Sequence, residues 1–118
     1  MNKRAIGSQN EELASRYLSH IGFEILERNW TCFGGELDIV AKDDGILVFV
    51  EVKSVGVRLF CKPYEMFTYT KKAHVLRTIN WFLHQNNLDP NSWRLDLVCL
   101  SKIPGKYDIQ HYRDVLNT

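Results

Sequence analysis

The chain has 118 residues, of which 25% are charged and 45% are hydrophobic, and its formal net charge is only +1. This length and composition predict a single globular domain over residues 1–118. The sequence contains no run of the ~18 apolar residues that a membrane span requires, and no apolar stretch of a secretory signal follows the basic residues of MNKRAIGSQNEE. We therefore expect a cytoplasmic protein without membrane association. The near-neutral charge argues against a uniformly basic nucleic-acid binder, so any basic surface must be local.

The three cysteines, Cys32, Cys61 and Cys99, stand apart and show no CxxC spacing. This argues against a disulfide framework and against a structural zinc site. We expect all three to be reduced, with Cys99 buried in an apolar strand. The four histidines also lack the spacing of metal ligands.

Apolar periodicity predicts two helices and five strands in the order α-β-β-β-α-β-β. The expected elements are a helix over Ser8–Ile21, strands over Phe23–Thr31, Glu36–Asp43 and Ile46–Ser54, a helix over Tyr69–Asn87, and strands over Trp93–Leu100 and Tyr107–Tyr112. The apolar run Trp93–Leu100 is suited to a buried strand parallel to a neighbour. This order predicts an α/β fold, with a mixed β-sheet flanked by helices.

Two of these strands form a hairpin whose turn sets the register. Asp44-Gly45 is a favoured two-residue turn, so Asp43 should pair with Ile46. Counting back along both strands places Asp38 opposite Glu51, with their Cβ atoms about 4.5–5.5 Å apart.

In the same count, Glu36 lies opposite Lys53, and strict alternation puts Leu37, Ile39 and Ala41 together on the other face. The expected result is two facing carboxylates with a lysine beside them.

Facing carboxylates repel each other unless a cation lies between them, and Mg²⁺ readily binds one or two carboxylates. Such an ion can polarise a phosphoryl oxygen and activate a bound water. Lys53 would add positive charge beside a phosphate, or orient the attacking water. The pattern therefore indicates phosphodiester hydrolysis, although short charged strings of this kind are also common on solvated strand faces.

Several segments in order resemble the YraN-like family of small bacterial proteins, an uncharacterised group for which an endonuclease activity has been suggested. The segments are GSQNEELASRYL, GFEILERNW, GELDIVAKDDGILVFVEVKS, Lys71 at the start of the second helix, and WRLDLV. The chain departs from the family pattern at Asn10, where the family usually has glycine, and at Ser54-Val55, where it often has Thr-Arg.

That family in turn resembles the PD-(D/E)xK superfamily of nucleases, which includes Holliday-junction resolvases. The resemblance implies a restriction-endonuclease-like α/β core. It implies Asp38, Glu51, Lys53 and Glu11 as catalytic residues. It also implies metal binding by Asp38, Glu51, Val52 and Glu11, with Mg²⁺ or Mn²⁺ as the cofactor.

Other polar residues have two interpretations. Glu11 lies three residues after Ser8, so it could instead cap the first turn of the helix. Glu36 is expected at the edge of the site, or as a cross-strand partner of Lys53.

Lys71, Arg58 and Lys62 are the candidates for nucleic-acid contact, whereas lysines and arginines on a helix usually mark a solvated face. The three tryptophans are expected in the core or at its rim. The segment from residue 55 to 68 could contact substrate or simply connect two elements.

The preferred function is a metal-dependent endonuclease that hydrolyses phosphodiester bonds of nucleic acid. DNA is favoured as substrate, in branched or single-stranded form. The alternative is a non-catalytic module on the same fold that binds nucleic acid or a protein, because fold and function separate easily. A homodimer is compatible with cutting two strands, but no dimer face is evident in the sequence.

Overall fold

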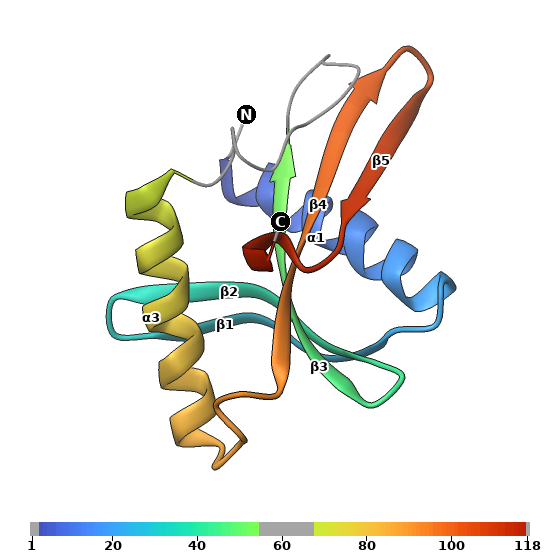
Figure 1. Ribbon diagram of the computed structural model, residues 1–118. Coiled ribbons are helices and arrows are strands. Elements are labelled where there is room, and N and C mark those ends of the chain that lie inside the picture. The colour runs from blue at the N-terminus through green and yellow to red at the C-terminus, as the bar shows by residue number, and fades with distance from the viewer. Residues whose placement is uncertain (1–2, 55–67, 118) are drawn as a thin grey trace.

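The computed structural model describes residues 3–54 and 68–117, and in these residues a five-stranded mixed sheet carries a helix on each face (Figure 1). The elements are α1 (Lys3–His20), β1 (Glu24–Cys32), β2 (Gly35–Asp43), β3 (Ile46–Ser54), α3 (Tyr69–Gln85), β4 (Trp93–Ile103), β5 (Lys106–Tyr112) and a short 3-10 helix, η1 (Val115–Asn117). The predicted α/β class and element order are confirmed. Within the described residues, no helix is long and apolar enough to cross a membrane.

The strands follow the order β1-β2-β3-β4-β5 across the sheet. Neighbouring strands are antiparallel except for β3 and β4, which run parallel. The parallel pair requires the chain to cross over from one end of the sheet to the other, and α3 lies in this connection. The prediction of a parallel partner for Trp93–Leu100 is therefore confirmed.

The two faces of the sheet form two apolar clusters, one beneath each helix. Alternate residues of β3 and β4 point to opposite faces, as the strand period requires. The cluster beneath α1 contains Ala14, Leu18, Phe23, Ile39, Ala41, Val48, Val50, Val98 and Leu100. The cluster beneath α3 contains Leu37, Val40, Leu47, Phe49, Val75, Ile79, Phe82, Leu83, Leu95, Leu97, Cys99 and Val115. Burial on both faces explains why β3 and β4 read as nearly continuous apolar runs.

The hairpin between β2 and β3 has the predicted turn. Asp44 and Gly45 both have positive φ, 52° and 84°, as a type I′ turn requires. Asp43 pairs with Ile46, and the ladder continues in the predicted register to Ile39 and Val50. The last observed pair is one step short of Asp38 and Glu51.

The predicted start of the first helix is wrong. The helix begins at Lys3 rather than at Ser8. Glu11 therefore lies about two turns inside α1, beyond the first turn whose free N–H groups a capping side chain can reach. This position removes the capping interpretation of Glu11.

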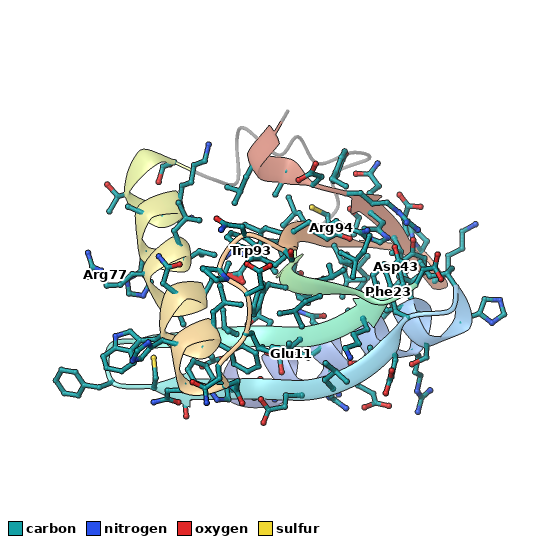
Figure 2. The ribbon with its side chains drawn as sticks, turned by 60° about the horizontal axis from the view of Figure 1, so that its bottom comes forward. Glu11, Phe23, Asp43, Arg77, Trp93 and Arg94 are labelled. Atoms are coloured by element: carbon teal, nitrogen blue, oxygen red, sulfur yellow. The ribbon has the colours of Figure 1, made fainter. Side chains whose placement is uncertain are left out.

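A buried polar network connects the strands and α1 at the side where Figure 2 shows Asp43 and Arg94 close together. Asp96 is fully buried, and its carboxylate accepts hydrogen bonds from Arg94 Nε at 2.9 Å and from the Asp114 N–H at 3.0 Å. His111 Nε2 lies 2.9 Å from the same carboxylate, and Nδ1 lies 2.9 Å from the Tyr17 hydroxyl. Burial alone would raise the pKa of Asp96, but its bonds to His111, Arg94 and Asp114 together lower it.

The expectation that every cysteine is reduced is wrong, because Cys99 forms a disulfide. Cys99 is fully buried in β4, as predicted. Cys32 is free, and Cys61 lies outside the described residues. Spacing along the chain could not reveal this bond, because a disulfide depends on which distant segments the fold brings together.

Candidate metal centre

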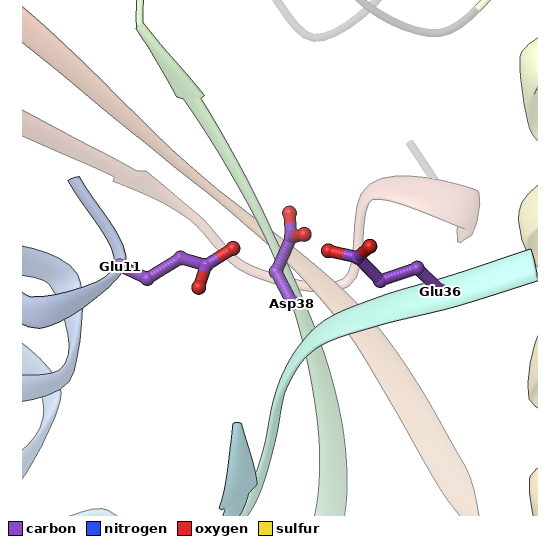
Figure 3. A group of neighbouring side chains, drawn as sticks. All are labelled: Glu11, Glu36 and Asp38. Atoms are coloured by element: carbon purple, nitrogen blue, oxygen red, sulfur yellow. The ribbon is translucent and has the colours of Figure 1, made fainter. Parts of the chain in front are cut away.

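Three carboxylates converge at the point where α1 meets β2. Each of Glu11, Glu36 and Asp38 offers an oxygen, and these oxygens all lie within 4.8 Å of one another. Figure 3 shows the carboxyl groups of Glu11 and Glu36 pointing toward Asp38 from opposite sides. Glu11 is buried, Asp38 is half-buried and Glu36 is exposed, so the group opens to solvent on one side. Oxygen donors of this kind are the ligands that Mg²⁺ and Mn²⁺ prefer.

Asp38 stands where β2 leaves the regular sheet. Ile39 packs beneath α1, but Leu37 packs beneath α3, so the predicted alternation of these two side chains is wrong. The ladder to β3 ends at Ile39, and Asp38 Oδ2 accepts a hydrogen bond from the Val52 N–H at 2.9 Å instead. Because the regular pairing of β2 with β3 ends here, the Val52 N–H of β3 donates to the Asp38 carboxylate instead of to a backbone carbonyl of β2.

Glu51 shares a proton with Asp38. Their side chains are hydrogen-bonded, an interaction that lowers the pKa of Asp38 and raises that of Glu51, so Glu51 is the donor. Burial and the nearby charge of Asp38 raise the pKa of Glu51 to about 8. Burial also raises the pKa of Asp38. The predicted neighbours are thus in contact, and near neutral pH they carry one proton between them.

Lys53 accompanies this pair. Its Nζ lies 4.0 Å from Glu51 Oε1, and its charge lowers the pKa of both Glu51 and Asp38. Among the described ion pairs, Lys53 therefore pairs with Glu51 along the same strand, and the predicted cross-strand pair with Glu36 is not formed.

Glu11 is positioned by residues of β1. Burial and the charge of Asp38 raise the pKa of the Glu11 carboxyl group, whereas a hydrogen bond with the Asn29 side chain lowers it. The net shift of the Glu11 pKa is upward. The next glutamate, Glu12, faces outward and pairs with Arg16 at 3.0 Å and Arg28 at 2.6 Å. The two adjacent glutamates of α1 thus have opposite surroundings.

Sequence reasoning missed Asn29. It has a φ of 54° inside β1, a left-handed conformation that asparagine tolerates better than most residues. Its neighbours pair with β2 on both sides, Arg28 with Ile39 and Trp30 with Leu37. Asn29 therefore lies beside Asp38, where both strands depart from regular geometry. The signal in the sequence was an asparagine, which is rare in strands, within an otherwise strand-like segment.

Of the remaining predicted site residues, only Val52 contacts this acidic cluster in the part of the chain that the structure describes. Val52 contributes its N–H to Asp38, and its apolar side chain leaves only its backbone oxygen as a ligand atom. Lys71 is exposed in the first turn of α3, where its N–H bonds to Thr68 Oγ1 at 3.3 Å. Arg58 and Lys62 lie outside the described residues, as does all of the segment from residue 55 to 68 except Thr68, for which substrate contact and a simple connection were both open.

Comparison with known proteins supplies the family. Residues 10–100 match a protein family that is described as "Uncharacterised protein family UPF0102". This chain belongs to that family. Relatives named "UPF0102 protein" include one from Carboxydothermus hydrogenoformans, 38% identical over 99% of both chains. A second, from Caldicellulosiruptor saccharolyticus, is 41% identical over 83% of each chain. A third, from Beutenbergia cavernae, is 39% identical over 96% of this UPF0102 chain and 97% of its own. The family match spans all of the carboxylates described above.

Proposed function

We propose that this UPF0102 protein is a metal-dependent endonuclease that hydrolyses phosphodiester bonds of nucleic acid, with DNA as the favoured substrate and the cytoplasm as its location. The observation that carries the proposal is the convergence of Glu11, Glu36 and Asp38 within 4.8 Å, beside the hydrogen-bonded Glu51 and its neighbour Lys53. Neither a capping role nor an exposed salt bridge accounts for three converging carboxylates.

The donor set fits a hard divalent cation. Glu11, Glu36 and Asp38 would hold Mg²⁺ or Mn²⁺, with Glu51 and the backbone oxygen of Val52 next to them. The raised pKa values of Glu11, Asp38 and Glu51 reflect buried negative charge that lacks compensation. When bound, such a cation polarises a phosphoryl oxygen and acidifies a coordinated water.

The protein's own groups have separate roles in this proposal. The Val52 N–H holds Asp38 in one orientation, and Asn29 does the same for Glu11. Glu51 holds a proton near neutral pH because its pKa is raised to about 8, and a cation bound nearby would favour release of that proton. The Lys53 ammonium group places positive charge where a phosphate would approach, which favours the more negative transition state.

A cleavage panel tests the proposal. Single-stranded, duplex and branched DNA, and RNA, are incubated with Mg²⁺ or Mn²⁺ and the wild-type protein. We expect cleavage of at least one form, and a loss of about 100-fold or more in the Asp38→Asn and Lys53→Met variants. Lys42→Met, which removes an exposed lysine of β2, is the matched control and should retain activity.

Glu11 and Glu12 offer a second matched comparison, because they are adjacent on α1 but only Glu11 faces the cluster. Glu11→Gln should abolish cleavage, whereas Glu12→Gln should not. If the wild type cuts none of these nucleic acids with either metal, the endonuclease proposal fails. Salt-dependent binding that survives Asp38→Asn would then favour a non-catalytic binding module.

A further inference from the structure

The outer face of α3 is basic and lacks any acidic residue. The helix sequence YTKKAHVLRTINWFLHQ contains no aspartate or glutamate. Lys71, Lys72, His74, Arg77 and His84 are all exposed on this helix, and of these His74, Arg77 and His84 lie on the side away from the core. Because the whole chain has a formal charge of only +1, this helix concentrates positive charge that the average composition conceals. Such a face attracts a polyanion.

Two aromatic side chains are exposed on α3 and on the hairpin that packs against it. Trp81 on α3 is 48% exposed, and Phe33, between β1 and β2, is fully exposed at 102%. By contrast, Trp30 and Trp93 pack against the core, as the sequence predicted for tryptophan. Exposed aromatic rings next to cations are the groups on which unpaired bases stack.

Arg77 and His84 lie on the same side of the helix as Trp81, away from the buried residues. Arg77 and Trp81 are four residues apart, so they are neighbours on the helix surface. Together with Asn80 and His84 they line an open hollow of about 290 Å³. Figure 2 shows Arg77 projecting from α3 away from the sheet, where a ligand can reach it.

The packing of α3 places the helix beside the strand that carries Glu36 and Asp38. A Cβ atom on Gly35 would lie 2.1 Å from Thr78 Oγ1, so the helix lies directly on the first residue of β2. The next residue of β2 is Glu36, a member of the acidic cluster. Phe33 lies two residues before Gly35, and Trp30 of the same hairpin meets the Phe82 ring at 5.1 Å. The hairpin thus connects Phe33 to Glu36 alongside α3.

We propose that Phe33, Arg77 and Trp81 form a surface that binds an unpaired nucleic-acid strand and leads it toward the acidic cluster, an inference that rests on the proposed endonuclease function. The cations bind the phosphates, and the two rings stack on bases that a duplex would keep paired. The negatively charged Glu11, Glu36 and Asp38 lie outside this basic surface. In the proposal, the phosphate backbone of the nucleic acid would approach them through a bound metal ion.

Binding is measured without cleavage, by fluorescence anisotropy of a labelled thymidine oligonucleotide of ~16 residues in EDTA. We expect wild type to bind it more tightly than the matching duplex. Trp81→Ala and Phe33→Ala should each weaken binding by roughly 5- to 150-fold, whereas Trp81→Phe retains a ring and should bind nearly as wild type. Tyr107→Ala removes a 41% exposed aromatic residue of β5, the strand at the opposite edge of the sheet, and is the matched control.

The contribution of charge has its own measurement. Arg77→Ala should reduce the slope of log K against log salt by about 0.7, because one phosphate contact on a single strand is lost. Lys106→Ala, which removes an exposed lysine of β5, should leave that slope unchanged.

The surface is wrong if wild type does not bind the oligonucleotide, or if Trp81→Ala and Phe33→Ala bind it as wild type does. A change in oligomeric state in Trp81→Ala, with unchanged binding, would instead assign the face to a second copy of the chain. These outcomes are separable from those of the cleavage panel. If the wild type cleaves nucleic acid but Trp81→Ala binds the oligonucleotide as tightly as the wild type, only the proposed surface is refuted. If Trp81→Ala binds more weakly but the wild type cleaves nothing, only the proposed endonuclease activity is refuted.

Discussion

The proton shared by Glu51 and Asp38 makes a specific prediction about stability and pH. In the folded protein the pKa of Glu51 is raised from its ordinary value of 4.5 to about 8. Between these values the folded state holds a proton that the unfolded state has released. The folded state therefore binds more protons, and the free energy of unfolding falls as the pH rises through this window.

The size of the effect follows from the shift. One pKa unit corresponds to about 1.4 kcal/mol, so the loss between pH 4.5 and about 8 is on the order of 3–5 kcal/mol. This is a large part of the roughly 5–15 kcal/mol that stabilises a small domain. Below pH 4.5 the group is protonated in both states, and above about 8 it is ionised in both, so the dependence should level off on either side.

Urea denaturation across this pH range, in EDTA and followed by circular dichroism, measures the effect. Glu51→Gln imitates the protonated side chain and should lose most of the pH dependence, so that it is more stable than wild type at pH 8. Glu12→Gln changes an exposed glutamate of α1 and should follow wild type. If wild type and Glu51→Gln lose stability in parallel, the shared proton is not the cause and the reasoning is refuted.

Saturating Mg²⁺ provides the complementary measurement on the wild type. A cation that binds only the folded state stabilises it, and it competes with the proton on Glu51. The stabilisation by Mg²⁺ should therefore grow as the pH rises toward 8, and it should be much reduced in Glu51→Gln. A stabilisation by Mg²⁺ that does not change with pH would contradict competition between the cation and this proton.

Three further substitutions test other parts of the structure. Gly35→Ala should destabilise the protein by about 1–3 kcal/mol in urea, because its Cβ would lie 2.1 Å from Thr78 Oγ1, and Thr78→Ala should recover part of the loss. Asp96→Ala should cost about 3–5 kcal/mol in the same assay, because it leaves the buried partners of that carboxylate without compensation. Lys53→Met removes a positive charge that lowers the pKa of Glu51. The pKa of Glu51, measured by carbon NMR, should therefore be higher in this variant than in the wild type.

Each of these has a control outcome. Lys42→Ala, at an exposed position of the strand that contains Gly35, should leave stability near wild type. Arg16→Ala breaks only an exposed pair with Glu12 and should not shift the denaturation midpoint measurably. A Gly35→Ala protein as stable as wild type would show that α3 can move away from β2 without loss. A Glu51 titration unchanged by Lys53→Met would remove Lys53 from the electrostatics of the site.

The hairpin and its two facing carboxylates could be predicted from the sequence, because each depends on local rules. Asp44-Gly45 sets the turn, and a strand period of two carries the register back to the pair Ile39 and Val50. The contact between Asp38 and Glu51 follows from the same count. The order of helices and strands was also predictable, since apolar periodicity reflects which faces are buried.

The tertiary structure decided what local rules cannot reach. Glu11 joins Asp38 because α1 begins at Lys3 and packs across the sheet, and Glu36 joins them because β2 bends at Asp38. The protonation of Glu51 depends on burial by residues that are distant in the sequence.

The same is true of the exposed rings and of the residue that holds Glu11. Trp81 and Phe33 are exposed only because the core buries other residues of α3 and the hairpin. Asn29 reaches Glu11 only where β1 runs beside α1. The sequence thus determined the elements and the acidic residues that the hairpin supplies, whereas the packing of the helices determined which carboxylates converge, their charge state and their surroundings. The physical reason is that strand register is set by neighbouring residues, but desolvation and convergence of charges are set by the whole fold.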